Sequence, residues 1–114
     1  MTKTKVYVAC PYTKGDMGVN VKNSIDVTED LIEAGFIPFN PLYSHFQHMA
    51  HPRPYDHWLA IDLEWIKVCD YVLRLPGEST GADIETNYAN ENNIPVYYSI
   101  NELIYEKRNP HQPV

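Results

Sequence analysis

The 114-residue chain contains only two cysteines, Cys10 and Cys69, so it has no disulfide framework. It also lacks any hydrophobic run near the roughly 20 residues that a membrane-spanning helix needs. Residues 1–5 are polar and lead directly into an apolar run, so we expect no signal peptide. The protein is therefore expected to be cytoplasmic and to have no membrane partner.

Basic residues are scarce as well. Nine Lys and Arg against fifteen Asp and Glu give a formal net charge of −6. This balance argues against a nucleic-acid polymer as partner, because such binders carry a basic face. It leaves room for a pocket that holds one small anion. The hydrophobic share of 44% and the charged share of 21% are those of an ordinary globular domain.

Short β-rich runs alternate with segments of helical length. Strands are expected at residues 6–9, 36–39, 71–75 and 95–98, with Pro38 indicating an edge strand. Helices are expected from about Val21 to a C-cap at Gly35, and at residues 56–68, 81–92 and 101–108. Residues 13–20, 41–54 and 76–80 are expected to be loops or turns.

This alternation predicts an α/β fold. We expect a single three-layer domain over residues 1–108, with a four- or five-stranded parallel sheet of the Rossmann or flavodoxin type, and a loose C-terminal tail at 109–114. In such sheets, ligands bind at the carboxyl ends of the strands. Residues 10–18, 40–55 and 76–85 are therefore expected to line a site.

Asp62 is placed unusually on the helix expected at 56–68. At about 100° per residue, it falls near the middle of the apolar face. A carboxylate in a packed face is costly unless it is paired or functional, so Asp62 either serves a site or pairs structurally with a loop, Lys or Arg. The apolar stripe consists of Trp58, Ile61, Trp65 and Cys69, widened on one side by Leu59, Leu63 and Ile66.

Glu85 repeats this pattern on the helix expected at 81–92. It falls among apolar residues in the expected first turn, where the helix dipole stabilises a negative charge. An ionised, partly desolvated carboxylate suits a nucleophile or general base, and a capping contact is the alternative. The apolar side is expected to hold Ala82, Ile84, Tyr88 and Ala89, and the polar side Asp83, Thr86, Asn87 and Asn90.

The turn before this helix combines a hydroxyl, a glycine and free backbone N–H groups. Ser79 and Gly81 could hold a phosphate or carboxylate there. Alternatively, Ser79 serves only as an N-cap. The neighbouring Glu78 would repel a phosphate, which leaves a neutral ligand open.

These segments together resemble the nucleoside 2-deoxyribosyltransferase-like proteins. This group includes the 2'-deoxynucleoside 5'-phosphate N-hydrolases and many small, often phage-encoded members. The resemblance covers residues 6 to about 98. It rests on residues 6–13 (VYVACPYT), on 62–65 (DLEW) followed by 69–72 (CDYV), and on Ser79-x-Gly81-x-x-x-Glu85 followed by Ala89 and 94–96 (IPV).

The resemblance implies a role for each matching position. Glu85 would attack the anomeric carbon of the deoxyribose, Asp62 would orient the sugar or protonate the leaving base, and Tyr7 would fix the Glu85 carboxylate. Ser79 and Gly81 would bind the 5' end of the sugar. The family also implies a homodimer or larger assembly, and no cofactor. Further residues expected to bind substrate are Cys10, Pro11, Tyr12, Asn40, His48 and Trp58.

The sequence supports two functions for such a site, catalysis and binding. The first reading is cleavage or transfer of the N-glycosidic bond of a 2'-deoxynucleoside or its 5'-monophosphate, which parallels retaining glycoside cleavage. The alternative is a non-catalytic nucleotide-binding or sensing protein that retains the pocket. Both make a small nucleoside or nucleotide the partner.

A histidine-rich segment gives a third reading. His45, His48 and His51 recur every three residues, which invites a metal-binding regulatory role. No cysteine lies nearby and no helix is expected to align the three rings, so we expect no metal. We favour a lid over the site, with Arg53 able to contact a phosphate, and a plain surface loop is the alternative. The rings expected to stack on a base are Phe46, His48, Tyr55 and Trp58.

Overall fold

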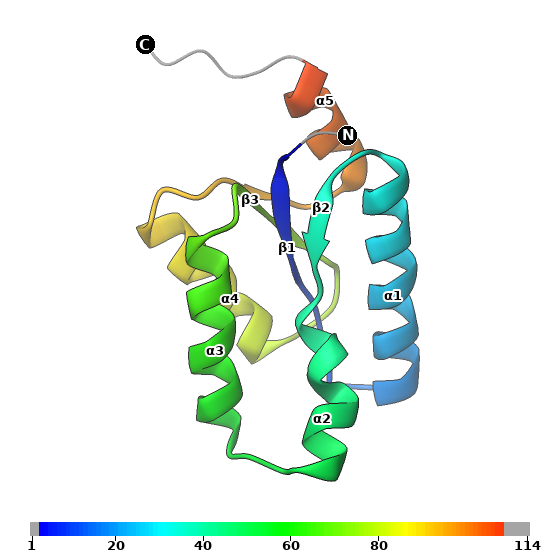
Figure 1. The fold of residues 1–114 in the computed structure, drawn as a ribbon, viewed down its shortest axis with the longest axis vertical. Coiled ribbons are helices and arrows are strands. Elements are labelled where there is room, and N and C mark those ends of the chain that lie inside the picture. The colour runs from blue at the N-terminus through cyan, green and yellow to red at the C-terminus, as the bar shows by residue number, and fades with distance from the viewer. Residues whose placement is uncertain (1–2, 109–114) are drawn as a thin grey trace.

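The computed structural model describes residues 3–108, and the tail expected at 109–114 lies outside this range. Four parallel strands form one sheet in the order β2-β1-β3-β4. They are β1 (Lys5–Ala9), β2 (Ile37–Phe39), β3 (Tyr71–Arg74) and β4 (Val96–Tyr97). The sheet lies between two helical layers (Figure 1). The predicted three-layer α/β fold with a four-stranded parallel sheet is confirmed.

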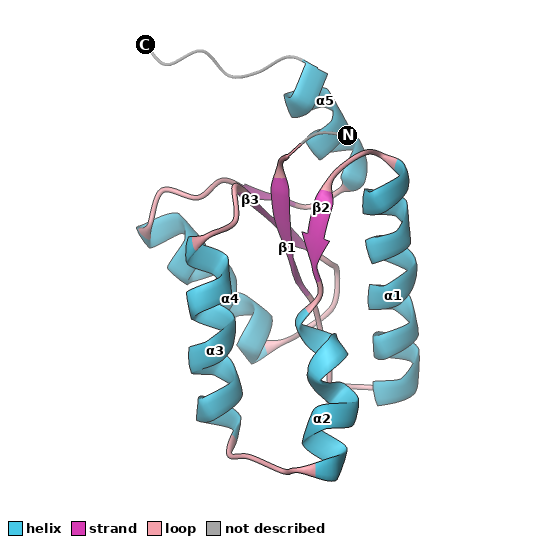
Figure 2. Ribbon diagram, in the orientation of Figure 1, coloured by secondary structure: helices cyan, strands magenta, loops and turns pink. Residues whose placement is uncertain are grey.

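Each face of the sheet has its own apolar cluster, because alternate strand residues point to opposite faces. On one face, Val6 and Val8 of β1 pack with helices α1 (Met17–Glu33) and α5 (Ile100–Arg108). On the other face, Tyr7 and Ala9 pack with α3 (Tyr55–Lys67) and α4 (Thr80–Glu91). Figure 2 shows these helices on either side of the strands.

The central strands β1 and β3 define the switch point of the sheet. After β1 the chain crosses to α1 on one face, and after β3 it crosses to α4 on the other. The two connections therefore diverge at adjacent carboxyl ends and leave a crevice between them, where ligands bind in folds of this kind.

The first helix begins earlier than predicted. Asp16 accepts a hydrogen bond from the backbone N–H of Val19 and caps α1 at Met17, within the segment expected to be a loop. At the other end, Gly35 has φ +90°, the left-handed conformation that glycine adopts easily just beyond a helix.

The segment 41–54 is largely helical, which corrects the prediction of a long loop. The Asn40 side chain accepts from the backbone N–H of Leu42 and caps a 3₁₀ turn at Pro41–Tyr43, and α2 (Ser44–Ala50) follows directly. Proline is favourable at the first helical position because its missing N–H would have no partner there.

The packed face of α3 is rotated from the predicted stripe. Ile66 is fully buried, but Ile61 and Trp65 are 44% and 46% exposed. The flank of the predicted stripe, rather than its centre, meets the sheet and α4. The Trp65 ring stacks instead on Phe39 of β2, with centroids 4.8 Å apart.

A smaller correction applies to α4, where Ile84 is exposed and Thr86 is buried. Its hydroxyl is satisfied locally by donating to the carbonyl of Asp83. No helix among residues 3–108 is long and apolar enough to cross a membrane.

Candidate active site

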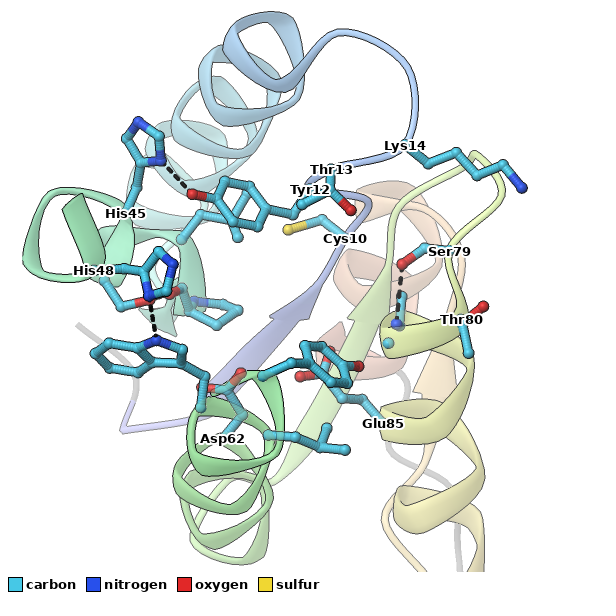
Figure 3. A pocket seen from close by; sticks show the side chains of 18 of the residues that line it. Cys10, Tyr12, Thr13, Lys14, His45, His48, Asp62, Ser79, Thr80 and Glu85 are labelled. Atoms are coloured by element: carbon cyan, nitrogen blue, oxygen red, sulfur yellow. Dashed lines mark hydrogen bonds between the residues drawn. The ribbon is translucent and has the colours of Figure 1, made fainter. Parts of the chain in front are cut away.

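A cavity of about 480 Å³ opens at the carboxyl ends of β1 and β3. Its walls come from the segment after β1, from the 3₁₀ turn at Pro41–Tyr43, from α2 and α3, and from the start of α4 (Figure 3). All three segments predicted from the sequence contribute to these walls, and α3 adds Trp58, Leu59 and Asp62 beyond them. The lining residues include Cys10, Tyr12, Lys14, His45, His48, Arg53, Tyr55, Trp58, Asp62, Ser79, Gly81 and Glu85.

Glu85 and Asp62 meet in this cavity from two helices. Glu85 comes from α4 and is 5% exposed, and Asp62 comes from α3 and is half-buried. Figure 3 shows both side chains at the same end of the cavity. Tyr7, fully buried on β1, donates its hydroxyl hydrogen to Glu85 Oε2 at 2.5 Å. The two carboxyls therefore sit against one phenol donor beneath a cavity open to ligands.

Burial governs the protonation of this group. Loss of water raises the pKa of Asp62, against lowering by hydrogen bonds with Glu85 and Tyr7. Burial also raises the pKa of Glu85; the Tyr7 hydrogen bond opposes the rise and the Asp62 charge adds to it. The pKa of Tyr7 is raised by burial and by both carboxylates, so its hydroxyl remains a donor. Two such carboxyls titrate as one coupled pair.

Glu85 is the sixth residue of α4, not a first-turn residue, because the helix begins at Thr80. The dipole effect falls off within the first turn, so the predicted dipole stabilisation does not apply. A residue that the sequence analysis missed contributes instead: the positive charge of Arg74 lowers the pKa of Glu85. Arg74 is 9% exposed and pairs with Asp83 at 3.0 Å.

The start of α4 forms another part of the wall. Ser79 is the N-cap of α4 and accepts from the backbone N–H of Ala82 at 3.1 Å. The backbone N–H groups that open this helix are the kind that accommodate an anion. Gly81 lies close to Tyr55, since a Cβ there would be 2.7 Å from the Tyr55 hydroxyl oxygen.

Charged side chains also line the cavity. Lys14, a residue that sequence reasoning did not single out, pairs with Glu78 at 2.9 Å, and both side chains are exposed. Arg53 lines the cavity as well. The Glu78 carboxylate that would repel a phosphate is thus partly balanced by a lysine.

Aromatic and imidazole groups form the wall contributed by α2 and α3. His48 accepts from the indole N–H of Trp58 at 2.8 Å, with the two rings edge to face. Tyr12 and His45 form a short hydrogen bond between the hydroxyl and Nδ1. From the sequence, His45 was considered only as a possible metal ligand. Its place in the wall follows from α2, which the sequence did not predict.

Three residues expected to contact the substrate do not line the cavity. Asn40 is fully buried and donates to the hydroxyls of Ser24 and Thr28, so its amide holds β2 against α1. Pro11 lies against Gly77, and Phe46 is 73% exposed outside the cavity.

Cys10 does line the cavity, as expected. Burial raises the pKa of its thiol to about 12, so it stays protonated and can contact a ligand only as a small, weakly polar group. Among residues 3–108, no three His, Cys, Asp or Glu side chains come together in a way that could hold a metal ion.

The fold and cavity define a Rossmann-like α/β domain with a small-molecule pocket at the switch point of its sheet. The chain belongs to the family described as "Domain of unknown function (DUF7768)", whose model matches residues 4–99. No curated protein matches the chain.

One solved structure similar to this chain is a 2-deoxyribosyltransferase from Bacillus psychrosaccharolyticus. The TM-score is 0.61 at 21% sequence identity, over 82% of this chain and 69% of that one. At this identity the likeness concerns the fold. The resemblance stated from the sequence is confirmed to that extent.

Proposed function

We propose that this protein cleaves or transfers the N-glycosidic bond of a 2'-deoxynucleoside or its 5'-monophosphate. The observation that carries the proposal is the buried group formed by Tyr7, Glu85 and Asp62 beneath the cavity. Buried carboxyls with raised pKa values are typical of glycoside chemistry, where one group stays ionised while the other holds a proton. The solved relative supports the substrate class, since it is named a 2-deoxyribosyltransferase.

In the first step, a Glu85 oxygen attacks the anomeric carbon of the deoxyribose. A bond forms between that carbon and the oxygen, the carbon–nitrogen bond to the base breaks, and its electron pair goes to the base nitrogen. Asp62 supplies a proton to the departing base when it holds the proton of the pair.

In the second step, water or another base attacks the same carbon from the vacated side and its proton passes to Asp62. The bond to Glu85 breaks and restores the carboxylate. Tyr7 positions the attacking oxygen through its 2.5 Å hydrogen bond. In this proposal, the backbone N–H groups at the start of α4 and the side chain of Lys14, which lines the cavity, receive the 5' end of the sugar or its phosphate.

The test is to incubate the protein with the four 2'-deoxynucleosides and their 5'-monophosphates and to measure free base by chromatography. We expect base release by the unaltered protein and loss of at least about 1,000-fold in Glu85→Gln, because no nucleophile remains. Mass spectrometry of the quenched reaction should find a deoxyribosyl group on Glu85. Base release that persists in Glu85→Gln would refute the nucleophile.

The alternative of a non-catalytic nucleotide-binding protein predicts a different result. It requires nucleosides or nucleotides to bind by calorimetry without any base release, by the unaltered protein and by Glu85→Gln alike. The observation behind this alternative is the His48–Trp58 pair in the cavity wall, since aromatic rings can bind a base by stacking without any bond being cleaved.

We further propose that the protein assembles as a homodimer or larger. The support is the exposed apolar row on α3 and just beyond it, formed by Ile61, Trp65 and Val68. Light scattering should give a mass of at least twice the 13.2 kDa of one chain. In Trp65→Ser this mass should shift towards that of the monomer. A monomeric unaltered protein would contradict the assembly and leave the proposed chemistry untouched.

A further inference from the structure

His48 on α2 holds two hydrogen bonds on one ring nitrogen. Its Nδ1 accepts from the indole N–H of Trp58 at 2.8 Å and from the backbone N–H of Arg53 at 3.3 Å. The ring is half-buried and lines the cavity, and Figure 3 shows the bond to the indole at one side of the ring.

These partners determine where the imidazole carries its proton. An indole N–H and a backbone N–H can only donate, so the Nδ1 of His48 must present a lone pair to both. A neutral imidazole with an acceptor at Nδ1 carries its hydrogen on Nε2. Among the hydrogen bonds of residues 3–108, none uses this Nε2. The cavity wall therefore offers a fixed donor.

The neighbouring His45 differs in this respect. Its Nδ1 contacts the hydroxyl of Tyr12, which can donate or accept, so that contact leaves either tautomer open. Of the two imidazoles in the cavity wall, His48 alone has a tautomer determined by its neighbours.

We infer that His48 selects nucleobases that present a carbonyl oxygen to it and disfavours bases that present an amino group there. This inference rests on the proposed nucleoside substrate. Guanine and thymine carry carbonyl oxygens at positions where adenine and cytosine carry amino groups. Against the Nε2–H of His48, a carbonyl completes a hydrogen bond, whereas an amino group leaves two donors facing each other without an acceptor. Sites with such a polar contact reject the mismatched analogue strongly.

The experiment compares two pairs of substrates that differ by this exchange: 2'-deoxyinosine with 2'-deoxyadenosine, and 2'-deoxyuridine with 2'-deoxycytidine. Binding is measured by calorimetry and base release by chromatography. In at least one pair, we expect the carbonyl-bearing member to be preferred on the order of 10-fold or more. In His48→Phe the ratio should fall towards one. In His48→Glu, which presents only acceptors when ionised, it should reverse.

Two further variants sharpen the result. Trp58→Phe removes the donor at 2.8 Å and leaves only the longer bond from the Arg53 backbone N–H at 3.3 Å to hold the tautomer, so the preference should weaken although the His48 ring remains. His51→Phe is the matched control, because His51 is exposed at the end of α2 and does not line the cavity. The preference of this variant for the carbonyl-bearing substrate should equal that of the unaltered protein. Circular dichroism should show that every variant is folded.

The outcomes separate this inference from the proposed function. Carbonyl preference in binding without base release supports the role of His48 and refutes the chemistry. Base release with a ratio that His48→Phe and His48→Glu leave unchanged refutes the role of His48 and leaves the chemistry standing. Failure of all four nucleosides and of their 5'-monophosphates to bind or react overturns both.

Discussion

Tyr7 and Glu85, 78 residues apart in the chain, share a buried hydrogen bond of 2.5 Å from the phenol hydroxyl to Oε2. The bond joins the central strand β1 to helix α4 beneath the cavity. This hydrogen bond holds the Glu85 carboxylate in place and favours its ionised form.

Removing this donor should alter the pH profile as well as the rate. In Tyr7→Phe we expect kcat/KM to fall by about 10- to 100-fold, the value of a hydrogen bond to a charged group. Because the hydrogen bond lowers the pKa of Glu85, its loss raises that pKa further. The acid limb of the pH–rate profile should therefore move to higher pH. An unshifted limb would mean that Tyr7 acts only in packing.

Glu85 should make the protein less stable at alkaline pH. Burial raises its pKa in the folded state above the ordinary value of 4.5. At a pH between the ordinary pKa and the raised pKa of the folded state, the unfolded state has released the proton while the folded state retains it. The unfolding free energy should then fall by at most about 1.4 kcal/mol per pH unit.

Glu85→Gln removes this ionisation, so at pH 9 the variant should have a larger unfolding free energy than the unaltered protein. Urea unfolding at pH 5 and pH 9 measures the difference. Glu91→Gln, an exposed carboxyl at the end of the same helix, should retain the pH dependence of the unaltered protein. Equal slopes in all three proteins would contradict a buried, proton-retaining Glu85.

Arg74 should contribute to both stability and ionisation. Its guanidinium donates to the carbonyls of Leu75 and Gly77 and pairs with Asp83, holding the turn that leads into α4. Arg74→Met should cost about 2 kcal/mol by leaving these acceptors unsatisfied, and should shift the acid limb to higher pH because the charge that lowers the pKa of Glu85 is lost.

Arg74→Lys separates the two effects, since it keeps the charge but not the fork of donors. Compared with Arg74→Met, the pH profile of Arg74→Lys should return closer to that of the unaltered protein than its unfolding free energy does. Asp83→Asn, at an exposed carboxylate, should change the unfolding free energy by no more than about 1 kcal/mol. A larger cost for Asp83→Asn than for Arg74→Met would place the importance in the ion pair instead.

Gly81→Ala should act on substrate affinity rather than on folding. The added Cβ would lie 2.7 Å from the Tyr55 hydroxyl oxygen, and Tyr55 is 60% exposed and free to swing outward. We expect stability to change by less than about 1 kcal/mol while KM rises. The double variant with Tyr55→Ala should show a smaller further effect than the two single changes summed, because the clash is removed.

Glu78→Gln tests for a 5'-phosphate near the rim of the cavity. Its carboxylate pairs with Lys14, so its removal frees a cation and removes a repelling charge. We expect use of a monophosphate to rise a few-fold relative to the nucleoside, an effect that shrinks with added salt. A constant ratio would place the 5' end of the substrate elsewhere.

The alternation of strand and helix signals was enough to predict the parallel three-layer fold. Val6–Ala9 and the run from Tyr71 are apolar and β-rich, and each is followed by a helix with a polar side. Local periodicity also placed Asp62 and Glu85 on apolar helix faces, because a carboxylate out of phase with its neighbours is visible without tertiary information.

The sequence failed where the outcome depended on contacts between distant segments. Periodicity predicted a buried stripe through Ile61 and Trp65, but packing against α4 and β2 left both side chains half-exposed. Asn40 was expected at the site, yet two hydroxyls of α1 use its amide. Arg74 gave no signal, since a lone arginine in a strand does not reveal that it will be buried among carbonyls.

The sequence by itself determined the fold class, the edge of the sheet where a site would lie, and the two carboxyls most suited to chemistry. The family resemblance already pointed to Tyr7 beside Glu85, where the structure has a hydrogen bond. Only the tertiary structure decided that Arg74 lowers the pKa of that carboxyl and that Trp58 directs the proton of His48. The physical reason is range. Periodicity reports how a side chain relates to its own helix or strand, whereas a hydrogen bond or a charge effect depends on which groups packing brings together.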